Sequence, residues 1–223
     1  MNGPPKMHRL GPLDDWRALL PTGLRFLLYA MLPALVIEWF VLAASSRRAY
    51  HLAAENAPLE WGQVGLLAVT IALLVAAARR RPSMRTLFLW LTVFPLWALI
   101  RELDGFLERM LFDSAWEVLA WGIAVVYVYV GWRKRQDLLA QMLVFVRSRA
   151  FVLFFGSFVT VIVLAQLIGQ SVLWEGIMGD AYMRDVKRVV EELLEASGYC
   201  LAVCAGVECL VEGTEDRRAE STD

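Results

Sequence analysis

Long apolar runs alternate with short polar connections along most of the chain. Each run approaches the roughly 20 residues that a helix needs to cross about 30 Å of hydrocarbon. The runs cover residues 24–44, 59–78, 86–100, 115–132, 150–174 and 193–211. The pattern predicts an all-α, polytopic membrane helical bundle with about six transmembrane helices, in which residues 22–211 form the membrane domain.

The short connections differ in charge, and this difference predicts how the chain is oriented in the membrane. Connection 79–85 contains four arginines and no acid, and connection 133–149 contains five basic residues and one acid, Asp137. Lys and Arg in short loops favour the cytoplasmic side. With six spans, both connections and both termini are then cytoplasmic, so that segment 1–21 is a cytoplasmic arm and segment 212–223 a cytoplasmic tail.

The remaining connections are predicted to face outward. They are 45–58, 101–114 and 175–192. Segment 136–148 mixes apolar and polar positions in the manner of an amphipathic helix lying on the inner membrane surface.

Composition agrees with a membrane protein and narrows the set of partners. The chain is 58% hydrophobic and carries a net charge of −1, so it has no global field that attracts nucleic acid. We expect membrane lipids as partners, and no nucleic acid. Three cysteines fall within the last run, where an odd number argues against a disulfide framework. No Walker loop, GxGxxG, HExxH or GxSxG motif is present, and we predict no cofactor.

Polar side chains gather near the outward ends of the predicted spans, with Glu208 the main exception. Ionisable residues inside a membrane are expensive and mark a functional site by default. The candidate ligand- or cation-binding residues are Glu38, Glu60, Gln63, Arg101, Glu102, Asp104, Glu117, Glu195 and Tyr199.

Three of these residues stand out by position. Glu38 lies five to six residues inside its run, roughly 8–9 Å deep, and is expected to face protein. Glu195 shares a helical stripe with Gly198, Ala202 and Gly206, small residues that let helices approach closely, so its carboxylate is predicted to point into the bundle. Arg101 ends an apolar run among acids and is predicted to be the central cation of the cluster, shared by Glu102, Asp104, Glu60 or Glu195.

Several nearby charges fit the ordinary behaviour of helix ends. Lys187 with Glu191 and Arg188 with Glu192 have the i,i+4 spacing of exposed helical salt bridges. The residues assigned to this group are Glu108, Arg109, Asp113, Glu175, Glu191 and Glu192.

Three short blocks carry a resemblance. They are Glu55-Asn56-x3-Glu60-Trp61, Arg101-Glu102-x-Asp104 and Glu191-Glu192-x2-Glu195-x3-Tyr199. In these blocks the chain resembles uncharacterised bacterial multi-pass inner-membrane proteins, and the resemblance implies a place in the bacterial inner (cytoplasmic) membrane. It implies no activity.

Alkaline-ceramidase-like membrane hydrolases also combine a helical bundle with acids near a polar face. Such a resemblance would imply a zinc site built from several histidines. The chain has only His8 and His51, predicted on opposite sides of the membrane, so a three-histidine site cannot form.

Three functions fit the outward cluster. It could bind a cation, protons or a small polar ligand, as in a transporter or sensor. It could use paired carboxylates to act on a lipid or lipid-linked substrate. It could also be purely structural, with Arg101 and its acids locking the helices together.

Overall fold

The structure is a computed structural model that describes residues 15–45 and 58–220, with side chains described for residues 22–42 and 58–212. Within these ranges all regular structure is helical, without strands. The first half contains α1 (Asp15–Ser45), α3 (Pro58–Arg80), η1 (Pro82–Met84), α4 (Arg85–Leu91), α5 (Val93–Glu102) and α6 (Asp104–Met110). The second half contains α7 (Ala115–Arg133), α8 (Arg135–Phe145), α9 (Arg149–Phe158), η2 (Val159–Ala165), α10 (Gln166–Ile168), α11 (Ser171–Met178), η3 (Gly179–Ala181) and α12 (Arg184–Glu220).

Six of the described helical stretches are long and apolar enough to cross a membrane, as predicted. They are Thr22–Leu42, Pro58–Arg80, Pro82–Glu102, Ala115–Arg133, Arg149–Ile168 and Arg184–Glu212. Many large apolar side chains point outward, among them Trp121, Val125 and Val128 on α7. An apolar outer surface of this extent is expected where helices face lipid. The helix predicted over 136–148 is also present, as α8.

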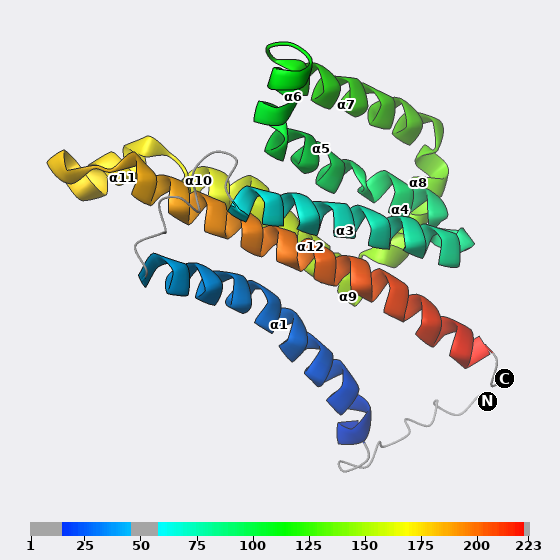
Figure 1. Cartoon of the computed structure of the whole chain (residues 1–223). Coiled ribbons are helices and arrows are strands. Elements are labelled where there is room, and N and C mark those ends of the chain that lie inside the picture. The colour runs from blue at the N-terminus through cyan, green and yellow to red at the C-terminus, as the bar shows by residue number, and fades with distance from the viewer. Residues whose placement is uncertain (1–14, 46–57, 221–223) are drawn as a thin grey trace, which may run out of the picture.

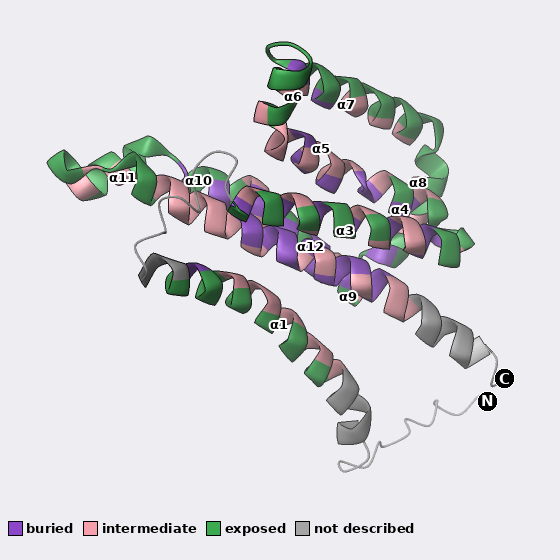
Figure 2. Cartoon of the chain, viewed as in Figure 1, coloured by how far each residue is buried: buried purple, intermediate pink, exposed green. Residues whose placement is uncertain are grey.

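The last span, α12, is the centre of the bundle (Figure 1). It packs against α3, α9 and α1, and 61% of its most apolar window is buried, compared with 6% for α1 and 11% for α7. Figure 2 shows the same contrast, with buried residues concentrated on α12 and exposed ones on α1 and α7. The geometry of the polar site described below therefore depends on what α12 contacts.

The third span is broken into α4 and α5 at Thr92. Pro95 has no backbone N–H to donate to the carbonyl of Leu91, so the regular i→i−4 ladder fails at this point. The Thr92 hydroxyl donates to the Leu89 carbonyl at 2.6 Å and lies 2.6 Å from the Tyr127 hydroxyl of α7. The break thus provides a polar contact between the third and fourth spans.

The fifth span contains a π-helical segment, η2, and ends earlier than predicted. The predicted run continued to residue 174, but the helix stops at Ile168, and α11 begins separately at Ser171. At the stop, a Cβ on Gly169 would lie 2.8 Å from the Ala165 carbonyl oxygen and 2.6 Å from Glu191 Cδ. Only glycine fits this close turn. The sixth span, in contrast, starts nine residues before the predicted position 193.

The small-residue stripe of α12 does allow close packing, as predicted. A Cβ on Gly198 would lie 2.4 Å from Val161 Cγ2, and one on Gly206 would lie 2.8 Å from Leu73 Cβ. Ala202, between the two glycines, is fully buried. The stripe therefore brings α12 against the π segment on one side and α3 on the other.

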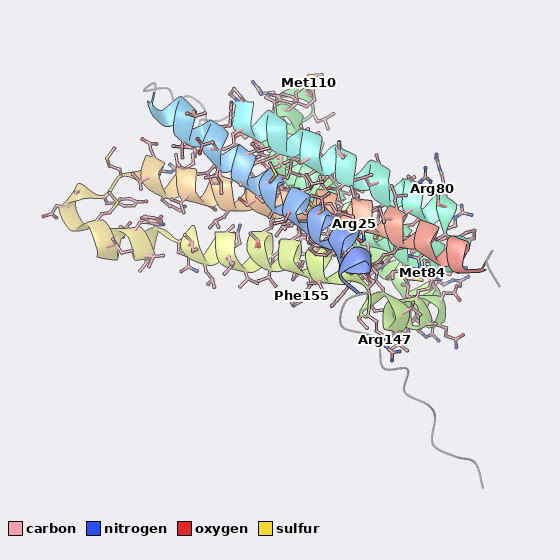
Figure 3. The ribbon with its side chains drawn as sticks, turned by 90° about the horizontal axis from the view of Figure 1, so that it is seen from below. Arg25, Arg80, Met84, Met110, Arg147 and Phe155 are labelled. Atoms are coloured by element: carbon pink, nitrogen blue, oxygen red, sulfur yellow. The ribbon has the colours of Figure 1, made fainter. Side chains whose placement is uncertain are left out.

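One end of the bundle is basic. Arg80, Met84 and Arg147 lie together at this end in Figure 3, far from α11 at the opposite end. Here Gln141 of α8 accepts a hydrogen bond from the backbone N–H of Leu87 at 2.7 Å, which satisfies an amide in the first turn of α4.

The first span is held to the last by a buried polar contact nearer the basic end. Arg25 Nε lies 3.1 Å from Glu208 Oε1, and the Tyr29 hydroxyl donates to the same oxygen at 3.0 Å. Glu208 is fully buried, so this exception to the outward gathering of acids has a partner in α1.

Candidate functional site

A polar cavity of about 560 Å³ lies between the start of α3, the α5–α6 turn and the first turns of α12. It is at the opposite end of α3 from the arginines Arg79 and Arg80. Six acids and two arginines line it, which leaves a surplus of four negative charges when all are ionised. The charged lining residues are Glu60, Arg101, Glu102, Asp104, Glu108, Arg188, Glu192 and Glu195.

Arg101 and Glu195 form the main ion pair of this cavity. Arg101 Nη2 donates to Glu195 Oε1, and Gln166 Nε2 donates to the same oxygen at 3.3 Å. The Glu195 side chain is 3% exposed and that of Arg101 is 27% exposed, so the pair is well shielded from solvent. The sequence-based predictions that Glu195 points into the bundle and that Arg101 contacts it are confirmed.

Glu102 is the second carboxylate. Its Oε1 accepts from the Tyr199 hydroxyl at 2.9 Å and lies 3.4 Å from Arg101 Nη2. Tyr199 is fully buried, and its ring packs with Leu67 beneath the cavity. Tyr199 therefore holds the Glu102 carboxylate in place. The Tyr199 hydroxyl in turn needs this acceptor, because it is buried away from solvent.

Glu192 is the third carboxylate, and Gln63 of α3 holds it. Gln63 Nε2 donates to Glu192 Oε2 at 3.0 Å and to the Glu192 backbone carbonyl at 3.1 Å. The carboxylate and the backbone carbonyl of Glu192 are both acceptors, so the side-chain nitrogen of Gln63, and not its oxygen, faces Glu192. Gln63 Oε1 then lies buried without a hydrogen-bond partner among the described residues.

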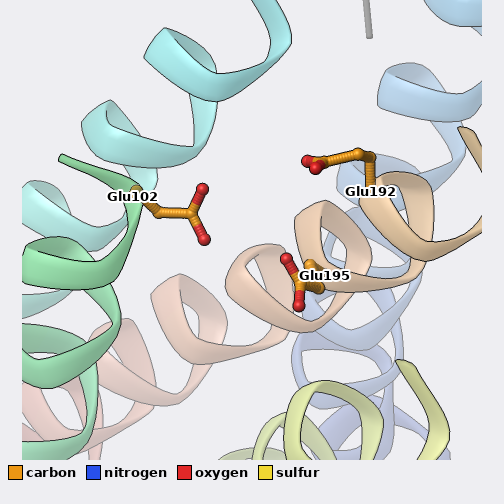
Figure 4. Close-up of side chains that lie close together, drawn as sticks. All are labelled: Glu102, Glu192 and Glu195. Atoms are coloured by element: carbon orange, nitrogen blue, oxygen red, sulfur yellow. The ribbon is translucent and has the colours of Figure 1, made fainter. Parts of the chain in front are cut away.

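The three carboxylates converge from two helices (Figure 4). One oxygen each from Glu102, Glu192 and Glu195 lies within 4.8 Å of the others. On α12 the spacing of residues 192, 195 and 199 is i, i+3 and i+7, which places them on one face. On α5, Arg101 and Glu102 occupy the last turn, where the guanidinium suits the negative end of the helix dipole.

Two further predicted residues line the cavity at its edge. Glu60, in the first turn of α3, is half-buried there. Asp104 is exposed, and its Oδ1 accepts from the Gly105 backbone N–H at the start of α6. Asp104 therefore serves the local turn, and the sequence-based suggestion that Arg101 shares it has no contact in support.

The structure does not bring Glu38 or Glu117 to the cavity. Both side chains are exposed, Glu38 on α1 and Glu117 on α7. The expectation that Glu38 faces protein is wrong, because the neighbouring Phe40 faces the bundle and packs with Leu59 and Ala196. A residue two positions away on a helix points about 200° around the axis.

Sequence reasoning missed Glu192. From sequence it is placed among ordinary helix-end charges, whereas its carboxylate converges with those of Glu102 and Glu195. The i,i+3 spacing of Glu192 and Glu195 was an available signal. The parallel prediction for Lys187 and Glu191 is confirmed at 3.4 Å, and Glu191 faces the Gly169 turn and not the cavity.

Fold and site together define the class of the protein, an all-helical bundle in which six described stretches are long and apolar enough to cross a membrane and a shielded Arg–carboxylate cluster lies at one end. No known family model, curated protein or solved structure matches the chain.

Proposed function

We propose that this protein binds a divalent cation in the polar cavity and works as a cation-dependent transporter or sensor. The observation that carries the proposal is the convergence of Glu102, Glu192 and Glu195 within 4.8 Å, with Arg101 as the adjacent cation. Three ionised carboxylates and one guanidinium leave two negative charges. A divalent cation neutralises that excess.

The spacing of the oxygens admits a divalent cation. Ca²⁺ binds oxygens at about 2.3–2.6 Å and Mg²⁺ at about 2.0–2.1 Å, and three oxygens within 4.8 Å of one another can surround either ion. Mg²⁺ demands near-ideal octahedral geometry, whereas Ca²⁺ accepts flexible sets of carboxylates and carbonyls. An irregular group of three glutamates therefore favours Ca²⁺ by its ligand type.

Gln63 holds one of the three acids from the neighbouring groove between α1 and α3, which it lines, and does not itself line the polar cavity. Its buried Oε1 has no donor among the described residues, and leaving such an acceptor unsatisfied costs about 1–3 kcal/mol. A water between Gln63 and Glu192 would satisfy this oxygen.

The positive-inside rule sets the proposed direction. The basic connections favour a cytoplasmic location for the end containing Arg80 and Arg147, and the cavity then opens outward in a bacterial inner membrane. Buried apolar residues, including Leu67, Ala98 and Val161, lie beneath Tyr199. The cavity would accordingly receive its cation from the outer side.

Calcium titration of the purified protein in detergent tests this proposal. Isothermal titration calorimetry should show one Ca²⁺ site, weaker for Mg²⁺. Glu195→Gln and Glu102→Gln should weaken Ca²⁺ binding about tenfold or more, while the matched control Glu117→Gln, an exposed acid outside the cavity, should bind as the wild type does. Equal Ca²⁺ binding by all four proteins, or none by the wild type, would reject the proposal.

A membrane enzyme is the second candidate, supported by an apolar groove beside the cluster. The groove, about 320 Å³, lies between α1 and α3, and Gln63 is one of its lining residues. An acyl chain there would place a headgroup near Glu192. Lipid turnover lost in Glu195→Gln but insensitive to Ca²⁺ would favour this function over the first.

A purely structural cluster makes a different prediction. Exchanging the charges of the central pair, as Arg101→Glu with Glu195→Arg, should then restore the stability that either single change removes. No Ca²⁺ effect should accompany the restored fold.

A further inference from the structure

A second groove lies at the basic end, between α4 and α7. Its volume is about 410 Å³, and its walls are mainly apolar, with Leu89 and Trp90 on α4 and Val126 and Val130 on α7. Arg85 and Lys134 stand at its rim. The groove is separate from the acidic cavity and shares no residue with it.

The groove has a closed floor and an open, basic rim. At the floor, Trp90 Nε1 donates to the Tyr127 carbonyl at 3.4 Å, and the Tyr127 hydroxyl contacts Thr92. Tyr127 precedes Lys134 by seven residues, which corresponds to about 10 Å along the helix. The two spans therefore touch through Trp90, and the groove lies beside this contact.

The two rim cations are available to a ligand. Arg85 is the first residue of α4 and Lys134 follows the last turn of α7, and both side chains are exposed. Within the described part of the chain, neither forms an ion pair with a carboxylate, although Asp137 lies one turn beyond Lys134. Two cations above an apolar slot match a ligand with an anionic head and a hydrocarbon tail.

We infer that this groove binds one anionic phospholipid, with its phosphate between Arg85 and Lys134 and one acyl chain between α4 and α7. The membrane supplies such a ligand directly, since the walls belong to two membrane-spanning helices. Anionic lipids attract basic residues at the membrane surface, by about fivefold in affinity per charge. A soluble anion would use the rim and leave the apolar walls without a partner.

Native mass spectrometry of the purified protein tests the inference, with phosphatidylglycerol and phosphatidylcholine of the same acyl chains as probes. The wild type should retain one phosphatidylglycerol in preference to phosphatidylcholine. Arg85→Gln with Lys134→Gln should weaken phosphatidylglycerol retention about tenfold or more. The control Arg133→Gln with Arg147→Gln removes the same charge at the same end but outside the groove, and should retain the lipid.

A filling variant, Val126→Trp, tests the acyl-chain contact without altering charge. It should also lose the bound lipid, and inorganic phosphate at millimolar concentration should not compete. Equal retention of both lipids, an equal loss in the control, or retention in Val126→Trp would overturn the inference. Competition by inorganic phosphate would assign the rim to a soluble anion and overturn it as well.

Discussion

Gly198 is the position where the packing of the site is most sensitive to one added methyl group. In Gly198→Ala the new Cβ would lie 2.4 Å from Val161 Cγ2 and 3.4 Å from both the Ser157 carbonyl oxygen and Thr160 Cβ. Carbon atoms at favourable contact are about 3.5–4.0 Å apart, so the helices must separate by about 1 Å. Val161 cannot easily rotate away, because a β-branched side chain in a helix has one strongly preferred rotamer.

The expected magnitude follows from two opposing effects. Overpacking of this kind costs about 1–3 kcal/mol, while alanine in place of glycine favours the helix by about 1 kcal/mol. The control Gly65→Ala, on α3, has no atom within 4 Å of its new Cβ and receives only the second effect. Gly198→Ala should therefore be about 1–3 kcal/mol less stable than Gly65→Ala.

The measurement is the unfolding free energy of the purified proteins in one detergent, followed by circular dichroism during denaturant titration. The double variant Gly198→Ala with Val161→Ala removes the closest clashing atom and should regain a large part of the loss. Equal stability of Gly198→Ala and Gly65→Ala would refute the close approach of α12 to the π segment. Failure of Val161→Ala to restore stability would refute the assignment of the clash.

Three other changes test the polar contacts through the same unfolding measurement. Arg101→Met leaves the facing carboxylates without their cation and should destabilise by about 3–5 kcal/mol, and Ca²⁺ should restore part of this; no Ca²⁺ effect would contradict the charge argument. Arg25→Met should destabilise by a similar amount. Arg25→Met with Glu208→Met and Tyr29→Phe, which also removes the hydroxyl that donates to Glu208, should come close to the wild type, because apolar replacement of a buried polar contact is near neutral; an unrestored triple variant would contradict this. Tyr199→Phe removes a hydrogen bond to Glu102 and should cost about 1.5–3 kcal/mol, and a neutral result would show that the bond contributes nothing.

The helices could be predicted from sequence because the signal is a local one. Twenty apolar residues in a row already satisfy the length and hydropathy of a span, and the small residues of α12 indicate close packing without a partner being known. The end of the fifth span was not predicted in this way. Hydropathy carries the run on through residues 172–174, although residues 169–171 are Gly-Gln-Ser. The extended backbone of Gln170 separates Ile168 from α11, and a hydropathy average does not register such a break.

The site could be predicted in part, for reasons of helix rotation. Arg101 and Glu195 were identified because each combines an ionisable group with an apolar run. Glu38 and Glu192 were misassigned because burial depends on which neighbour covers each face, and sequence does not give the rotation of α1 or α12 relative to α3. The role of Gln63 depends on helix rotation in the same way, because it comes from a hydrogen bond between Gln63 on α3 and Glu192 on α12.

The contact of α1 with α12 has a consequence for how the protein is made. Tyr29 and Glu208 are 179 positions apart, so α1 meets its polar partner only after α12 has been synthesised. Until then Arg25 and Glu208 enter the bilayer separately, each at the energetic penalty of an unpaired charge. The docking of α1 thus waits for the insertion of α12, and a chain truncated before residue 208 would lose the polar partner of Arg25 and Tyr29.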